Sequence, residues 1–70
     1  MTPLKTRIER QGYVLNFYLT IPSPFLAEIA GRSGFDAVTL DMQHGLIGYD
    51  AALPLLTALT TVDVVPMVRT

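Results

Sequence analysis

The stretch Asp36-Ala-Val-Thr-Leu-Asp41 is an apolar run with an acidic residue at each end, and Met42-Gln-His44 follows it directly. A short run of this composition is typical of a buried strand. Ligands of parallel α/β folds bind at the carboxyl ends of the strands, where the polar residues after this run would lie. The stretch therefore predicts a strand and a candidate site at its end.

Before this strand, the sequence predicts another strand over residues 13–21 and a helix over residues 25–34. Residues 13–21 are apolar at nearly every position, which favours a strand buried on both faces. The helix has Ser23 as its N-cap, Pro24 in its first turn and Gly34 as its terminator. Its apolar residues at helical spacing are Leu26, Ile29 and Ala30.

After the central strand, residues 49–59 return to helical spacing and residues 62–70 give a third strand. Pro54 is expected to kink or delay the helix, because proline lacks the backbone donor. Pro66 favours an edge or a bulge for the third strand. The apolar positions of the helix are Leu53, Leu56 and Leu59.

A short leading helix is predicted over residues 2–12, with Thr2 as N-cap, Pro3 at the first helical position and Gly12 just past the end. The remaining order of strand, helix, strand, helix and strand predicts right-handed crossovers and a parallel sheet. Two crossover helices are too few for a sheet that needs both faces covered. Residues 1–70 are therefore expected to be one partial α/β domain, truncated after its third strand.

Composition excludes several classes of protein. The chain has 70 residues, half of them apolar and 16% charged, which is too hydrophobic for a disordered tail. It has no cysteine and one histidine, so neither a disulfide nor a Cys/His zinc site can stabilise it. The net charge of −1 offers no basic surface for nucleic acid, so the expected partner is a small molecule or another protein.

Targeting signals are not apparent in the sequence. The first ten residues carry charges and no apolar core of a signal peptide. No run reaches the 18 or so apolar residues of a membrane span. A cytoplasmic location without membrane contact is expected.

The polar residues that suit chemistry are Asp41, Gln43, His44 and Arg69. Histidine exchanges a proton near neutral pH, and arginine binds a carboxylate or an enolate oxygen. His44 and Arg69 are about one α/β unit apart, so adjacent strand ends would bring them over one cleft. Simpler alternatives remain open: a solvated His44, an exposed Arg69, and an Asp41 that caps the next turn.

Two other features have simpler explanations. Gly31-Arg-Ser-Gly34 matches neither a nucleophile elbow nor a Walker loop, and its glycines fit the end of a helix and a turn. Tyr18 and Phe17 could line a pocket, although aromatic residues of a buried strand usually belong to the core.

Gly34-Phe-Asp36, the strand into Asp41-Met-Gln-His44, and Val65-Pro-Met-Val-Arg69 together resemble the amino-terminal part of the HpcH/HpaI aldolase family. The resemblance covers essentially all 70 residues. It implies the first three β/α units of a (β/α)8 TIM barrel, preceded by a short helix, in a homo-oligomer that is usually a hexamer. It also implies a metal-dependent aldolase that forms pyruvate and an aldehyde from a 4-hydroxy-2-oxo acid or a 2-keto-3-deoxy sugar acid.

Residue by residue, the resemblance implies that His44 is catalytic and that Arg69 binds pyruvate. Asp41 matches an acidic residue that supports the site from the same strand end, and Tyr18 falls near an aromatic position of the pocket wall. Gln43 stands where many members have Glu. The divalent cation (Mg, Mn or Co) would be held by ligands beyond residue 70, so the 70-residue chain alone is expected to be inactive.

Two alternatives remain. The chain could be a non-catalytic protein whose sheet edges pair with another subunit. It could also belong to a citrate-lyase-like acyl-CoA lyase, whose members tend to have an acidic motif in place of Asp41-Met-Gln-His44.

Overall fold

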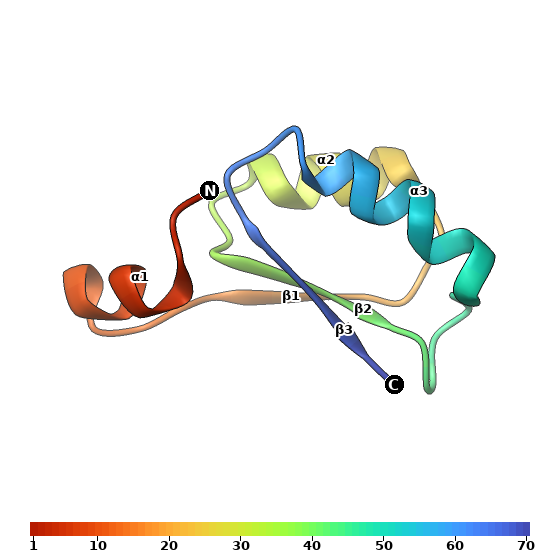
Figure 1. Cartoon of the computed structure of the whole chain (residues 1–70), viewed down its shortest axis with the longest axis horizontal. Coiled ribbons are helices and arrows are strands. Elements are labelled where there is room, and N and C mark those ends of the chain that lie inside the picture. Colours follow the sequence, from red (N-terminus) through yellow and green to blue (C-terminus); the bar gives the residue numbers. More distant parts are fainter.

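The computed structural model describes all residues from 1 to 70 and contains three helices and three strands. In chain order they are α1 (Leu4–Gln11), β1 (Asn16–Leu19), α2 (Pro24–Arg32), β2 (Ala37–Asp41), α3 (Tyr49–Leu59) and β3 (Val65–Arg69). Figure 1 shows α2 and α3 together on one side of the sheet, and α1 apart from them near the start of β1. The predicted alternation of strands and helices is confirmed.

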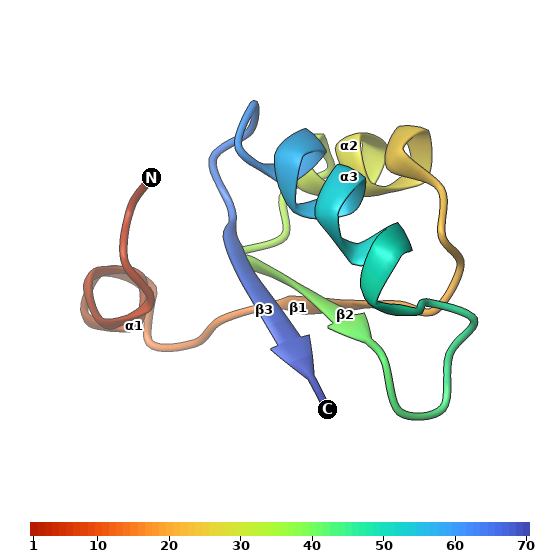
Figure 2. The same ribbon diagram turned by 45° about the vertical axis from the view of Figure 1, so that its right-hand side comes forward.

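The three strands form one parallel sheet in the order β1-β2-β3, as the sequence predicts. The central strand β2 is buried at all five positions. Strand β2 lies between its two neighbours, and Figure 2 shows both crossover helices over the same face of the sheet. The opposite face carries no layer of this chain, so a side chain on it is buried only by its neighbours in the sheet.

The core lies between the sheet and the two crossover helices. Its largest fully buried side chains are Leu19, Leu40, Leu55, Leu59, Val38 and Val64. Helix α3 faces this core with Ala52, Leu55 and Leu59, and α2 with Ala27 and Ala30. The predicted helix faces were therefore partly wrong.

The side chains of Leu53 and Ile29 are exposed, and those of Leu56 and Leu26 are half-buried. Of the predicted apolar positions, only Ala30 and Leu59 are fully buried, and Ala27, Ala52 and Leu55 complete the buried faces of the two helices.

The prediction of a strand over residues 13–21, buried on both faces, is wrong in length and in burial. Strand β1 covers only Asn16–Leu19, and Leu19 is its one buried residue. The reason is that β1 is an edge strand with one covered face. Among the large apolar side chains of this segment, those exposed are Tyr13, Leu15, Tyr18 and Ile21.

Local signals at the helix ends are largely confirmed. The Ser23 hydroxyl oxygen accepts a hydrogen bond from the Leu26 amide at 3.1 Å, and Gly12 and Gly34 have positive φ angles of 81° and 93°. The N-cap of α1 is Pro3, not Thr2 as predicted. The Thr2 amide instead donates a hydrogen bond to an Asp63 carboxylate oxygen at 3.0 Å.

Pro54 and Pro66, the two prolines within predicted elements, occupy different environments. Pro54 lies within α3, which begins at Tyr49 without delay. Pro66 lies in β3, an edge strand as predicted. The Val65 amide and the Arg69 carbonyl both bond toward β2, so the alternating Pro66 faces the free edge, where its missing donor breaks no bond of the sheet.

Gly31 has a packing role that the sequence did not reveal. It lies inside α2, where an added Cβ would collide with the side chain of Val62. Helix termination therefore explains Gly34 but not Gly31.

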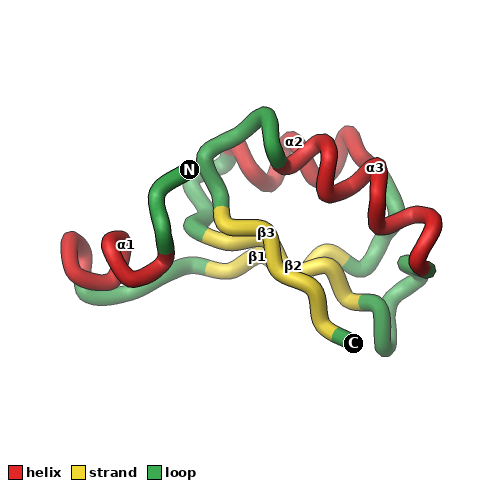
Figure 3. Tube along the Cα trace, viewed as in Figure 1, coloured by secondary structure: helices red, strands yellow, loops and turns green.

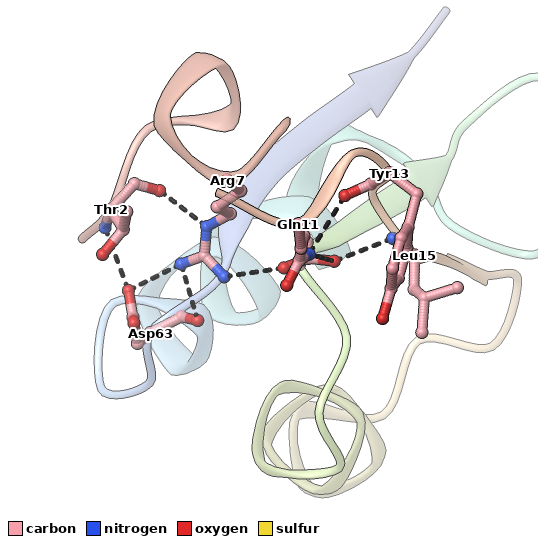
Figure 4. Close-up of polar contacts among 7 residues, drawn as sticks. Thr2, Arg7, Gln11, Tyr13, Leu15 and Asp63 are labelled. Carbon is pink, nitrogen blue, oxygen red and sulfur yellow. Dashed lines mark hydrogen bonds and ion pairs between the residues drawn. The ribbon is translucent and has the colours of Figure 1, made fainter. Parts of the chain in front are cut away.

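Helix α1 is held to the domain by polar contacts, because it contains no buried residue. Figure 4 shows the guanidinium of Arg7 at the centre of these contacts. It donates to Asp36 at 3.2 Å and to the Asp63 carboxylate at 2.7 Å, and its Nε donates to the Thr2 carbonyl at 2.7 Å. Asp36 also accepts from the Gln11 side chain and from the Leu15 amide.

The contacts at α1 predict loss of stability in acid. Hydrogen bonding to the Leu15 amide, helped by Arg7, lowers the pKa of Asp36 below its usual 3.8, and the Thr2 amide does the same for Asp63. Because these pKa values are lower in the folded chain, the stabilisation is present above about pH 4 and disappears as the pH falls through the folded values. The melting temperature should be level from pH 7 to 5 and fall below pH 4.

Asp36→Asn is the matched variant for this measurement. It should melt at a lower temperature at pH 7 and lose less on acidification, since one of the titrating groups is gone. A melting temperature that stayed constant down to pH 2.5 in the parent chain would contradict the prediction.

The chain is as compact as its mass allows. Its accessible surface is 4371 Å², against roughly 4300 Å² expected for a folded monomer of 7.7 kDa, and its radius of gyration is 11.6 Å. What is unusual is the composition of that surface, because large side chains such as Phe25, Leu46 and Tyr49 are more than 70% exposed.

Candidate functional site at the carboxyl edge of the sheet

The carboxyl ends of the three strands lie at one edge of the sheet. Figure 3 shows the loop after β2 and the end of β3 at this same edge. The loop is tied to both neighbouring strands: the Met42 amide donates to the Arg69 carbonyl at 3.0 Å, and the Leu46 amide donates to the Thr20 carbonyl at 2.9 Å. The backbone therefore fixes where residues 42–46 lie.

Asp41 organises the start of this loop. Its side chain is buried, and Oδ1 accepts hydrogen bonds from the Gln43 amide at 3.1 Å and the His44 amide at 3.0 Å. The alternative in which Asp41 caps the next turn is therefore confirmed. The His44 amide is the main cause of a lowered pKa for Asp41, to which the Gln43 amide and the charge of Arg69 also contribute, while burial opposes the shift. Asp41 is an anion at neutral pH.

His44 and Gln43 present their side chains to solvent. Neither side chain makes a hydrogen bond within the chain, so the imidazole of His44 is free to bind a ligand or water. The carboxylate of Asp41 bonds the backbone of His44, and thus it positions the loop.

Arg69 pairs in register with Asp41 across β2 and β3. Its side chain is exposed and makes no ion pair within 4.0 Å, although its charge acts on Asp41. Side chains alternate between the faces of a strand. Asp41 and Thr39 therefore share one face with Arg69, and the core residues of β2 occupy the face covered by helices.

Tyr18 lies on the same face as Arg69. Tyr18 pairs with Thr39, which precedes Asp41 by two residues on β2. Tyr18 therefore lies farther from the carboxyl ends of the strands than the pair Asp41 and Arg69. Below it, the Thr39 hydroxyl donates to the Asn16 side-chain oxygen at 2.8 Å. The phenol of Tyr18 is exposed, which is consistent with a position on the wall of a site rather than in the core.

Sequence reasoning missed Thr20 and Gly45. Thr20 directly follows β1 and its carbonyl accepts the Leu46 amide of the loop, a role that the prediction of one long strand over residues 13–21 conceals. A Cβ on Gly45 would lie 2.5 Å from the Asp41 carbonyl oxygen and 3.1 Å from Thr20 Cα, so the loop crosses the end of β1 closely at this glycine. A residue-by-residue alignment of the first predicted strand with the second is the sequence signal that could have revealed Thr20.

The predicted cleft over His44 and Arg69 is not enclosed by residues 1–70. The one cavity of the chain, about 240 Å³, lies at the other end of β3 and is lined by Met1, Leu59, Thr60, Val62, Val64 and Pro66. The strand-end residues form an open surface instead.

These residues do not form a metal site by themselves. No group of three or more His, Asp or Glu side chains comes together in the chain. At the carboxyl edge only Asp41 and His44 are suitable, and one carboxylate oxygen of Asp41 is already bonded to two amides.

Comparison with known proteins gives two similar curated relatives. The hydroxypyruvate/pyruvate aldolase of Cupriavidus necator is 30% identical over 67 residues, covering 96% of this chain and 25% of the relative. A protein of the same name from Rhizorhabdus wittichii is 38% identical over 53 residues, covering 76% of this chain and 21% of the relative. The chain thus spans about a quarter of the length of these relatives. No family model matches it.

Among solved structures, a variant of the citrate synthase SbnG superposes with a TM-score of 0.83 at 29% identity, over 97% of this chain and 30% of that one. The three parallel strands and their crossover helices therefore match the start of a TIM-barrel fold of the aldolase-like kind. The predicted fold class is confirmed. None of the helices α1, α2 and α3 has the length and apolar character of a membrane span.

Proposed function

We propose that residues 1–70 are the first part of a carbon–carbon lyase of the HpcH/HpaI type, which cleaves a 4-hydroxy-2-oxo acid or a 2-keto-3-deoxy sugar acid to pyruvate and an aldehyde. The observation that carries the proposal is the pairing of Asp41 with Arg69 beneath the loop that presents His44. The likeness to two proteins named hydroxypyruvate/pyruvate aldolase supports it.

In this proposal Arg69 binds the carboxylate of the 2-oxo acid through its planar fork of donors. His44, directly or through water, takes the proton of the C4 hydroxyl. The C3–C4 bond then breaks, the aldehyde leaves, and the electron pair remains on the pyruvyl fragment as an enolate. Transfer of the proton held by His44 to C3, directly or through water, gives pyruvate and restores neutral His44.

The proposed reaction also needs groups that lie outside residues 1–70. A divalent cation (Mg, Mn or Co) would stabilise the enolate oxygen, with ligands that residues 1–70 do not provide. We further propose that the complete protein is a homo-oligomer, a hexamer by the family resemblance, and that it is cytoplasmic.

The test is pyruvate release by the complete gene product that carries residues 1–70, with 4-hydroxy-2-oxo acids as substrates and Mg²⁺, Mn²⁺ or Co²⁺ added. We expect turnover at ordinary enzyme rates from that product and none from the isolated 70-residue chain. Turnover by the isolated chain would contradict the need for further residues, and none from the complete product would remove the aldolase proposal.

A second candidate is a citrate-forming enzyme, favoured by the likeness to the citrate synthase SbnG. The same preparation distinguishes the two when it is given oxaloacetate and an acetyl thioester, because these condense to citrate with release of the thiol. Cleavage of an acyl-CoA without citrate formation would point instead to an acyl-CoA lyase.

A further inference from the structure

The loop that carries His44 is anchored on both sides of that residue. The His44 amide donates to Asp41 Oδ1 at 3.0 Å, at the end of β2. Two residues later, the Leu46 amide donates to the Thr20 carbonyl at 2.9 Å, directly after β1. Figure 2 shows the loop extending beyond the end of β2 before it turns back to α3. Gly45 is the one residue between the two anchored amides.

Gly45 lies closer to the strand ends than a side chain would permit. A Cβ at this position would lie 2.5 Å from the Asp41 carbonyl oxygen and 3.1 Å from both Thr20 Cα and the Thr20 carbonyl oxygen. These are backbone atoms, so they cannot rotate away as the end of a flexible side chain would. An ordinary carbon–oxygen contact is about 3.4 Å, so the loop would have to move away from the strand end by about 0.9 Å.

Close approach, and not an unusual backbone conformation, is what requires glycine at this position. The glycines with positive φ angles are Gly12 and Gly34, so Gly45 has a negative φ angle, which alanine also adopts. Gly48 lies in the same loop with a φ angle of −90°, and an added Cβ there would have no atom within 4 Å. The space around the two glycines is therefore different, and Gly48 is a matched control for Gly45.

Resting on the proposed function, we infer that Gly45 is a positioning residue, whose missing side chain lets the loop cross the end of β1 closely enough to hold His44 in place for proton transfer. The imidazole is exposed and makes no hydrogen bond within the chain, so the backbone on either side of it determines where it lies. Proton transfer needs the imidazole within hydrogen-bond reach of the substrate. A misplacement of about 1 Å can lower a rate about 100-fold.

The experiment measures kcat and KM of the complete gene product for retro-aldol cleavage, with each variant assayed below its melting temperature. The loop relaxes in part around a new methyl group, so Gly45→Ala should lower kcat roughly 10- to 50-fold. KM should change less, because Arg69 lies on β3, outside the loop. Gly48→Ala adds the same methyl group in open space and should keep kcat within about twofold.

A double-mutant cycle shows whether Gly45 acts through His44. In a His44→Ala background the imidazole is gone, so Gly45→Ala should lower kcat by no more than about a further twofold. A merely structural role would lower kcat by the same factor in both backgrounds.

Hydrogen exchange of the parent tests the same geometry without a substitution. The Leu46 amide is bonded to Thr20, whereas the Gly48 amide has no partner within the chain. Relative to the intrinsic rate of each residue, the Leu46 amide should therefore exchange more slowly than the Gly48 amide.

The outcomes separate this inference from the proposed function. Turnover by the parent with an unaltered kcat in Gly45→Ala, or with equal losses in the two backgrounds, would overturn the role of Gly45 and leave the aldolase function standing. A Leu46 amide that exchanges as fast as the Gly48 amide would overturn that role even if Gly45→Ala did not fold. No turnover by the parent would remove the function and the role of Gly45 with it.

Discussion

Replacing His44 with alanine in the complete gene product should lower kcat by about 10²–10⁴, the usual contribution of a general acid–base group. The structure gives the reason for expecting a kinetic effect with little structural cost. The side chain is exposed and makes no hydrogen bond within the chain, whereas the backbone amide of His44 anchors the loop to Asp41. Alanine keeps that amide.

The measurement is kcat and KM for retro-aldol cleavage, with melting temperature as the structural control. The melting temperature should stay within a few degrees of the parent, and KM should change less than kcat. A kcat within about threefold of the parent would show that His44 is a solvated surface histidine without a catalytic role.

Substitution of Arg69 should produce the second large effect and separate charge from geometry. Arg69→Lys keeps the positive charge and loses the paired donors, so kcat/KM should fall roughly 10- to 100-fold, and Arg69→Ala should lose more. Stability should change little, because the side chain is exposed and has no ion-pair partner within the chain.

Arg32→Ala is the matched control for this series. Arg32 is also exposed and pairs only with Glu28 on its own helix, at 3.1 Å, far from the carboxyl edge of the sheet. Its loss should leave kcat/KM unchanged. Parent values for Arg69→Lys would mean that charge alone suffices, and parent values for Arg69→Ala would remove Arg69 from the site.

The order and type of the elements could be predicted because the local signals agree with the fold. Ser23, Gly12 and Gly34 mark helix ends by their own chemistry, and Pro66 correctly indicated an edge strand. The extent of β1 could not be predicted in this way. Its flanking apolar residues continue the strand pattern, but they lie where the chain provides no second layer to bury them.

The candidate site could also be predicted in part from the sequence. The spacing of one α/β unit between the loop after β2 and Arg69 anticipates that Asp41 and Arg69 lie on adjacent strands. Which atoms Asp41 bonds depends on the path of the loop, and that path is set by contacts with Thr20 and Arg69. Contacts of this kind join distant residues and leave no periodic signal.

The three strands also lie side by side in the order in which they are synthesised, so the sheet grows by adding each new strand to the one before it. Paired residues are 21 positions apart between β1 and β2 and 28 between β2 and β3, a separation that makes parallel sheets slower to fold than helical bundles. The strand order nevertheless suits a chain that emerges from the ribosome amino terminus first. The contacts of Asp63 with Thr2 and Arg7 join residues still farther apart, by 61 and 56 positions. The amino-terminal helix can therefore bond Asp36 early, but its contacts with Asp63 require the second crossover to be complete, which makes them the closing step of this folding unit.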